Sequence, residues 1–220
     1  MNRRERRRNL STLAKRPDAP ARFAADMKAA TATHRAGRVK EAEDIYRKII
    51  KAYAELPEVR VAWSNLGAVL MGQGRNEEAV GCLKKARALK PDHPPPHHNL
   101  GMALMALGRR EEAIESLAKA VELDPNFRDA WMALGTARQM AGDVPGAETA
   151  LRRVLELDEG MVEARYNLAV LLHGSARSDE AAEHLRRCLE LAPNFTQARS
   201  VLSSIENANA SSVAFSPFAS

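Results

Sequence analysis

The sequence predicts an all-α fold built from repeated pairs of helices, and three observations support that prediction. The first is a pattern that recurs every 34 residues, for example from Trp63 to His97 and on to Trp131. The second is the spacing of apolar residues within each copy, at steps of three and four, which is typical of an amphipathic helix. The third is a composition with 45% hydrophobic but only 5% aromatic residues and no run of alternating β-branched residues.

Four copies of the pattern align without a gap. Each carries, in order, a large side chain, Leu, a small residue, a turn residue, Ala, Leu, a small residue and Leu, usually followed by Pro. The first of them contains Trp63, Leu66, Gly67, Gly74, Ala79, Leu83, Ala86, Leu89 and Pro91. This order resembles the signature of the tetratricopeptide repeat (TPR) family, a helix-turn-helix unit of 34 residues. The resemblance implies a right-handed superhelical solenoid in which neighbouring repeats share one continuous core.

The predicted organisation places five repeats within residues 19–195. A basic N-terminal tail over 1–18 precedes them and is predicted to be flexible. A single helix over 196–207 is predicted to cover the last apolar face, and a second flexible tail spans 208–220. The five repeats cover 23–59, 60–93, 94–127, 128–161 and 162–195.

The first repeat departs most from the pattern. Its second half aligns through Gly37 and Tyr46, but Asp26, Ala29 and Thr33 stand where the pattern has Trp, Leu and a large side chain. We therefore expect its first helix to pack through weaker apolar contacts.

Glycines and prolines are predicted to end the helices. The turn within a repeat carries a glycine in three of the aligned copies, Gly74, Gly108 and Gly142. Ala176 occupies this place in the last repeat, which leaves open a shift of the turn to Gly174. Small residues such as Gly67 permit close approach of the partner helix. Arg138 replaces a core leucine, so its alkyl stem is expected at the edge of the core, with its head in water or beside an acidic partner.

The TPR resemblance implies that a ligand binds in a concave groove lined by the first helix of each repeat. The family's groove positions are the second, fifth, sixth, ninth, twelfth and thirteenth of a repeat. The sixth position carries a series of amides interrupted by Ala133, namely Asn65, Asn99 and Asn167. This series resembles the repeats of O-linked N-acetylglucosamine transferases, in which such amides hold an extended peptide by its backbone. A structural role, in which each amide stabilises a neighbouring repeat, is an equally good interpretation.

Methionine is unusually frequent at the other groove positions. Unbranched, polarizable side chains suit a surface that adapts to several apolar partners, although methionines at helical spacing more often belong to a core. The predicted groove residues, besides the amides, are Met71, His98, Met102, Met105, Met132, Met140, Tyr166 and His173. The groove does not match the carboxylate clamp of chaperone co-factor TPR domains, because Lys28 is the only basic residue at a fifth or sixth position.

The net charge of +5 is concentrated at one end of the chain. Seven basic residues against Glu5 give residues 1–16 a net charge of +6, so the remaining chain sums to −1. Nucleic-acid binding is therefore not expected of the repeats, and only the basic N-terminal tail retains that possibility. The second helices carry further basic residues in the favoured i, i+4 order after an acid, namely Glu43–Arg47, Asp44–Lys48, Glu115–Lys119, Glu148–Arg152 and Glu183–Arg187.

Motifs for catalysis, metal or cofactor binding do not stand out. His93 and His97 occur close together, but His97 takes the place of Trp63 and Trp131 and is interpreted as a packing residue. We expect no enzyme activity, no metal and no cofactor. Cys82 and Cys188 lie three repeats apart and are not expected to pair, which is consistent with a reducing compartment such as the cytoplasm. No apolar segment reaches the length of a membrane span.

The leading functional hypothesis is a protein interaction scaffold that binds a peptide segment or a partner helix in the groove. One alternative is a self-assembling scaffold, in which the first repeat or the last helix docks into another copy. A second is a non-catalytic subunit associated with a glycosyltransferase or methyltransferase.

Overall fold

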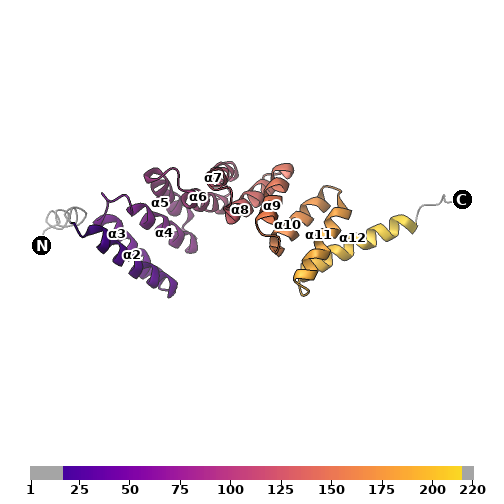
Figure 1. Cartoon of the computed structure of the whole chain (residues 1–220), viewed down its shortest axis with the longest axis horizontal. Helices are drawn as coiled ribbons and strands as arrows, with labels where there is room; N and C mark the ends of the chain where they lie inside the picture. Colours follow the sequence, from indigo (N-terminus) through magenta and orange to yellow (C-terminus); the bar gives the residue numbers. More distant parts are fainter. Residues whose placement is uncertain (1–16, 215–220) are drawn as a thin grey trace. The chain divides into compact units, whose positions relative to one another are not determined.

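The computed structural model describes residues 17–214, with side chains described as far as residue 210. Most of the predicted N-terminal tail, and residues 215–220 of the predicted C-terminal tail, lie outside the described residues. Eleven α-helices and no strand make up the described chain, arranged as successive antiparallel hairpins (Figure 1). They are α2 (Ala19–Arg35), α3 (Val39–Ala52), α4 (Val59–Gly72), α5 (Asn76–Leu89), α6 (Pro94–Ala106), α7 (Arg110–Leu123), α8 (Arg128–Met140), α9 (Val144–Leu157), α10 (Val162–Gly174), α11 (Ser178–Leu191) and α12 (Thr196–Ala214).

The chain divides into two compact units. Unit 1 extends from Met1 to Asp124 and contains α2–α7, and unit 2 extends from Pro125 to Ser220 and contains α8–α12. Within each unit every helix packs against the next one along the chain. The helix order confirms the predicted all-α solenoid of hairpin repeats.

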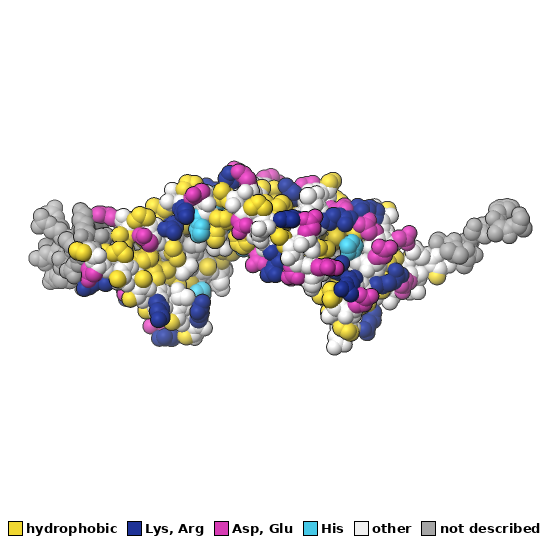
Figure 2. Space-filling model, viewed as in Figure 1, with side chains coloured by type: hydrophobic (Ala, Val, Ile, Leu, Met, Phe, Trp, Pro, Cys, Tyr) yellow, Lys and Arg dark blue, Asp and Glu magenta, His cyan; other side chains and the backbone are white. Residues whose placement is uncertain are grey.

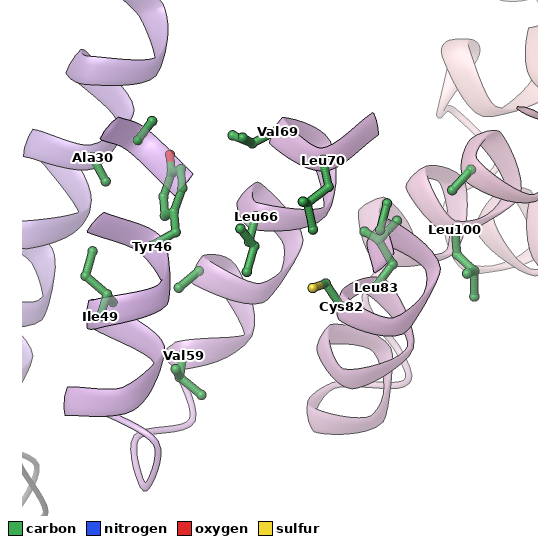
Figure 3. Packing of buried hydrophobic residues seen from close by; sticks show 14 of the residues in the cluster. Ala30, Tyr46, Ile49, Val59, Leu66, Val69, Leu70, Cys82, Leu83 and Leu100 are labelled. Carbon is green, nitrogen blue, oxygen red and sulfur yellow. The ribbon is translucent and has the colours of Figure 1, made fainter. Parts of the chain in front are cut away.

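The core of unit 1 follows the repeated pattern. Tyr46, Leu66 and Leu83 are fully buried and lie between successive helices, as Figure 3 shows. A Cβ added at Gly67 would lie 2.7 Å from the Leu83 Cγ, and one at Gly101 would lie 2.5 Å from the corresponding Leu117 atom. These glycines therefore set the distance between the two helices of a repeat, as predicted.

Unit 2 has its own core with the same arrangement. Leu151, Leu168 and Leu185 are fully buried between α9, α10 and α11. Leu202 and Ile205 of α12 extend this core to the last helix. The last complete hairpin is thus covered by α12.

The turns within the repeats use left-handed backbone. Gly37, Gly74, Gly108 and Gly142 have φ between 73° and 80°, which a glycine adopts without a Cβ penalty. In the last repeat the turn does not shift to Gly174. Ala176 itself takes φ 60°, while Gly174 ends helix α10. The spacing of the hairpin is therefore kept at the expense of strain at one non-glycine residue.

A recurring hydrogen bond closes the connection between repeats. At one position near the start of α6, α8, α10 and α12, a side chain donates to the backbone oxygen six residues earlier, where the previous repeat ends. The donor–acceptor pairs are His97–Pro91 at 2.7 Å, Trp131–Pro125 at 3.0 Å, Arg165–Glu159 at 2.6 Å and Arg199–Pro193 at 2.5 Å. Chemically different side chains thus donate a hydrogen bond to the backbone carbonyl at the equivalent position of each connection.

The two ends of the helical region compare differently with the predicted bounds. Helix α2 begins at Ala19, where the predicted repeat region begins and ahead of the first aligned repeat at 23, because Pro20 at its first turn starts the helix and Ala19 is already buried. Helix α12 continues to Ala214, beyond the predicted end at 207, so part of the predicted tail is helical. Glu206 of α12 pairs with Arg186 of α11 at 3.0 Å.

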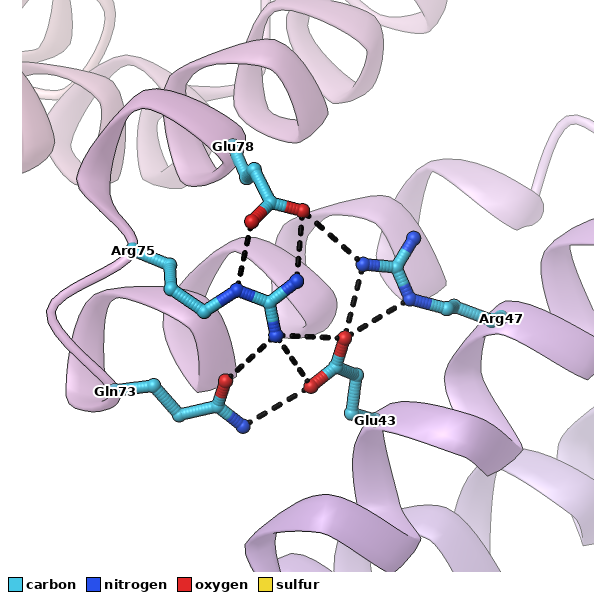
Figure 4. Close-up of polar contacts among 5 residues, drawn as sticks. All are labelled: Glu43, Arg47, Gln73, Arg75 and Glu78. Carbon is cyan, nitrogen blue, oxygen red and sulfur yellow. Dashed lines mark hydrogen bonds and ion pairs between the residues drawn. The ribbon is translucent and has the colours of Figure 1, made fainter.

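An ion-pair network joins the first two repeats on the side of their second helices (Figure 4). The Glu43 carboxylate of α3 accepts hydrogen bonds from Arg47, Gln73 and Arg75. Arg75, in the turn before α5, also binds Glu78 at 2.7 Å. The network therefore connects one repeat to the next through charged side chains.

Unit 2 contains the same network between α9 and α11. Glu148 takes the place of Glu43 and accepts hydrogen bonds from Arg152 and Arg177, the latter at 2.8 Å. Glu180 binds both arginines. Two junctions of the chain thus share one electrostatic arrangement.

The other predicted i, i+4 pairs do not form as ion pairs in the described chain. Lys119 and Arg187 pair with a glutamate three residues later, Glu122 at 2.5 Å and Glu190 at 2.6 Å. On a helix, side chains three residues apart are neighbours, as are side chains four residues apart. An acidic residue four positions before a basic one therefore does not determine which carboxylate the basic residue pairs with.

Candidate functional site

The first helices of unit 1, α2, α4 and α6, carry the predicted groove positions. A hollow of about 660 Å³ lies between α2 and α4. It is lined by Ala24, Met27, Lys28, Thr31, Ala32, Arg35, Val61 and Asn65. All but Ala32 stand at groove positions of the first two repeats, so the hollow coincides with the surface that the sequence assigns to ligand binding.

A chain of hydrogen bonds orients Asn65 at the edge of this hollow. Thr31 donates its hydroxyl proton to the Met27 backbone oxygen at 2.9 Å. The Tyr46 hydroxyl lies 3.3 Å from the Thr31 oxygen and must donate to it, because the Thr31 proton is already engaged. Asn65 Nδ2 in turn donates to the Tyr46 oxygen at 3.4 Å. The Asn65 carbonyl oxygen makes no hydrogen bond with the described chain and is available to a ligand.

Two cations stand beside the same hollow. Lys28 and Arg35 are exposed side chains of α2, and neither forms an ion pair with the described residues. Most arginines of the second helices and turns, by contrast, are paired with glutamates. The hollow therefore combines an apolar wall with unneutralised positive charge.

The second amide of unit 1 also contacts the preceding repeat. Asn99 Nδ2 donates to the Ser64 hydroxyl of α4 at 3.4 Å, and its oxygen lies 3.2 Å from His98 Nδ1. Asn65 and Asn99 thus both contribute a hydrogen bond between repeats, which agrees with the structural interpretation of the amide series. This one hydrogen bond between repeats leaves each amide with further hydrogen-bonding capacity.

The predicted methionines of unit 1 differ in exposure. Met71 and Met105 are half-buried and pack against the core, whereas Met102 is 37% exposed. Met27, at another groove position, is buried. Only part of the methionine series therefore offers its side chain to a ligand. On the face in view, Figure 2 shows many hydrophobic side chains gathered over unit 1.

The predicted residues of unit 2 form a separate set. Met132 packs half-buried against the core, and Tyr166 stacks at a tilt on Phe195 with ring centroids 4.9 Å apart. Met140 is 51% exposed. His173 Nδ1 lies 3.0 Å from the Ser178 hydroxyl at the turn of its own repeat. Asn167 makes no side-chain hydrogen bond with the described residues and is the least constrained of the three amides.

Sequence reasoning missed the residue that organises the hollow. The repeat pattern accounts for Tyr46 only as a core residue, where the other copies place Leu83, Leu117, Leu151 and Leu185. A hydroxyl on an otherwise leucine position was the available signal, because a buried tyrosine hydroxyl needs a partner.

A second hollow of about 590 Å³ lies between α5 and α7, beside His97. The His97 ring is buried, and burial lowers its pKa, although the hydrogen bond to the Pro91 oxygen works in the opposite direction. The described residues contain no group of three His, Cys, Asp or Glu side chains that could hold a metal ion. Cys82 and Cys188 are both buried free thiols, and burial raises the pKa of Cys188 to about 11. None of the helices described is both long enough and apolar enough to cross a membrane.

Family comparison gives the class of protein. Tetratricopeptide repeat models match residues 35–94, 70–137 and 139–205. The chain belongs to the tetratricopeptide repeat family. A search of curated proteins finds no relative of similar sequence.

Solved structures share the fold at low sequence identity. MamA from Desulfovibrio magneticus RS-1, residue 41 to its end, is 20% identical with a TM-score of 0.71, covering 79% of this chain and 96% of its own. YrrB, described as a TPR protein with an unusual peptide-binding site, is 23% identical with a TM-score of 0.67, covering 78% and 87%. A thermophilic TPR protein from Thermus thermophilus is 23% identical with a TM-score of 0.61, covering 83% and 98%. At these identities the likeness concerns the fold alone.

Proposed function

We propose that this chain is a protein interaction scaffold that binds a peptide segment of its partner along the groove formed by the first helices. The family supports the general class, because TPR repeats are protein–protein interaction modules and are typically non-catalytic. The peptide-binding site of YrrB makes an extended peptide a reasonable ligand for the same fold.

The observation that supports the groove most directly is the hollow between α2 and α4. Most of its lining comes from groove positions, and Asn65 presents there a carbonyl oxygen that has no hydrogen-bond partner among the residues the structure describes. A primary amide that is fixed on one side and free on the other can accept a peptide N–H whatever the peptide's side chains.

The test uses selection from a phage-displayed library of random dodecapeptides on the immobilised full chain. Val61→Glu places a charge at an exposed groove position of α4 that lines the hollow, and Leu89→Glu places the same charge at an exposed position of α5 outside the groove. We expect the unmodified chain and Leu89→Glu to capture the same peptides and Val61→Glu to lose them, with similar melting curves by circular dichroism. Peptides that bind all three proteins equally would show that the groove is not the site.

Unit 2 allows the same comparison. Met140→Glu tests the exposed groove position of α8, and Leu191→Glu is the matched change at the end of α11. An effect of Met140→Glu alone would extend the binding surface to unit 2. No effect of either change would confine peptide binding to unit 1.

A further inference from the structure

The hollow between α2 and α4 is lined by two cations, Lys28 and Arg35. We propose that it receives acidic side chains of the bound peptide, with Lys28 and Arg35 pairing with carboxylates and the Asn65 oxygen accepting a backbone N–H. The proposal rests on the proposed peptide-binding function and names the class of peptide that binds.

The charges of the groove point to an acidic ligand. At the groove positions of α2, α4 and α6, Lys28 and Arg35 are the only residues with a formal charge. Both line the hollow, and neither is neutralised by a carboxylate of the described chain. An acidic peptide can therefore pair with them without breaking an internal ion pair, which the glutamate-bound arginines of the other helices would require.

The apolar wall strengthens such a pairing. Met27 is buried and Val61 is 38% exposed, and both line the hollow beside Ala24. A peptide seated against this wall excludes water from the ion pair, and a lower local dielectric makes the attraction stronger than on an open surface.

The spacing of the cations favours side chains over a chain terminus. Lys28 and Arg35 are seven residues apart on one helix, about 10 Å along its axis. A peptide terminus supplies a single carboxylate, whereas two acidic side chains of an extended peptide can reach both cations. This geometry also differs from a clamp that takes its cations from successive first helices.

Tyr46 is the positioning residue of this site. Its hydroxyl holds Asn65 Nδ2, so the amide oxygen is the end left for the peptide. The other repeats have leucine at the corresponding place, which gives the orientation of Asn65 a cause found only at the first junction. Tyr46→Phe removes the hydroxyl while the ring continues to fill the core.

The experiment compares peptides selected from the same phage library, whose members are fused at their carboxyl end and carry no free terminal carboxylate there. Selection is performed on the unmodified full chain, on Lys28→Gln/Arg35→Gln, and on the control Lys40→Gln/Lys48→Gln, which removes two exposed cations of α3 outside the hollow. We expect enrichment of Asp and Glu with the unmodified chain and the control, and its loss with Lys28→Gln/Arg35→Gln. An individual acidic peptide should bind that variant about tenfold more weakly or worse.

The possible results separate this inference from the proposed function. Peptides captured without acidic enrichment, or enrichment that survives Lys28→Gln/Arg35→Gln, would overturn the inference and leave peptide binding in place. Failure to capture any peptide would overturn both. Enrichment that is lost equally in the α3 control would show a general charge effect and would also overturn the inference.

A double-mutant cycle tests the role of Tyr46. Tyr46→Phe should weaken a selected peptide about fivefold in the unmodified background and have no effect in the Asn65→Ala background, because the hydroxyl acts through the amide. Tyr53→Phe is the matched control, since it removes another buried hydroxyl of unit 1, bound to Asp26 at 2.7 Å, outside the hollow. An undiminished effect of Tyr46→Phe in the Asn65→Ala background would contradict the positioning role.

Discussion

Arg75 Nη1 lies 2.8 Å from the Glu43 carboxylate, although the two residues belong to different repeats. The same distance separates Arg177 and Glu148 in unit 2. In both places a turn arginine reaches back to a glutamate on the second helix of the previous repeat. The turn arginine therefore adds a contact between repeats that is separate from the apolar core. This contact depends on charge and on the geometry of the turn.

We predict that Glu43→Gln lowers the free energy of unfolding by about 1 kcal/mol, because the carboxylate is largely shielded and receives hydrogen bonds from three side chains. Glu41→Gln is the control, since Glu41 is exposed and pairs only with Arg38 of its own repeat. Urea denaturation followed by circular dichroism measures both. Equal losses in the two variants would contradict a special role for the inter-repeat pair.

The same network predicts an acid-dependent loss of stability. Burial of the Glu43 carboxylate works to raise its pKa, but hydrogen bonds from Gln73, Arg47 and Arg75 outweigh it and hold the pKa below its usual value. A carboxyl with a lowered pKa in the folded state contributes stability above its unfolded pKa, and this contribution is lost as the pH falls through the folded value. Unfolding measured below about pH 4.5 should therefore become less pH-dependent in Glu43→Gln than in the unmodified chain. An unchanged acid dependence would show that the network does not hold in solution.

Much of the fold could be predicted because the chain contains several copies of the same pattern, and each copy predicts the same helical hairpin. Each copy places Leu83-like residues against glycines such as Gly67, so one misread position does not change the result. The turn at Ala176 could not be predicted correctly from its residue, because the packing on both sides enforces the hairpin spacing against the local preference for glycine. The helix limits at Ala19 and Ala214 depend on end effects that the period does not contain.

The candidate site was less accessible to sequence reasoning. The period correctly brought Asn65 and Asn99 onto first helices, but their hydrogen bonds to Tyr46 and Ser64 depend on rotamers and on the neighbouring repeat. Met102 is more exposed than the half-buried Met71 and Met105, and this difference also depends on rotamers and on the neighbouring repeat. The resemblance of the amide series to O-linked N-acetylglucosamine transferases stays a prediction.

The left-handed turn at Ala176 predicts a stabilising substitution. Ala176→Gly relieves the Cβ strain of φ 60°, and part of the gain is offset by the greater flexibility of glycine in the unfolded chain. We expect the free energy of unfolding to rise by about 0.5 to 1 kcal/mol. Gly142→Ala is the reverse change at an equivalent turn with φ 80° and should be destabilising. A lower melting temperature for Ala176→Gly would contradict the strain.

Close packing at Gly101 predicts an effect of a single methyl group. A Cβ there would lie 2.5 Å from Leu117 Cγ, so Gly101→Ala should cost about 1 to 3 kcal/mol even though alanine favours helices. Gly81→Ala on an exposed helix surface meets no atom within 4 Å and should be neutral or stabilising by up to about 1 kcal/mol. Thermal unfolding of the two variants gives the comparison. Similar melting temperatures would mean that Leu117 moves aside at little cost.

The burial of the His97 ring predicts a pH dependence near neutrality. His97 is buried in the folded chain, and burial lowers its pKa, so the folded state favours the neutral ring. A histidine with a lowered folded pKa binds more protons when unfolded, and stability is therefore lost as the pH falls through its unfolded value of about 6.5. Trp131 makes the equivalent hydrogen bond without a titrating group, so His97→Trp should reduce the loss of stability between about pH 8 and pH 5. Burial also lowers the pKa of His93 and of His184, so both should contribute to a remaining dependence, which His184→Gln should reduce further. Urea denaturation across this pH range decides the matter, because an unchanged slope in His97→Trp would mean that the His97 ring is not held neutral at the repeat junction.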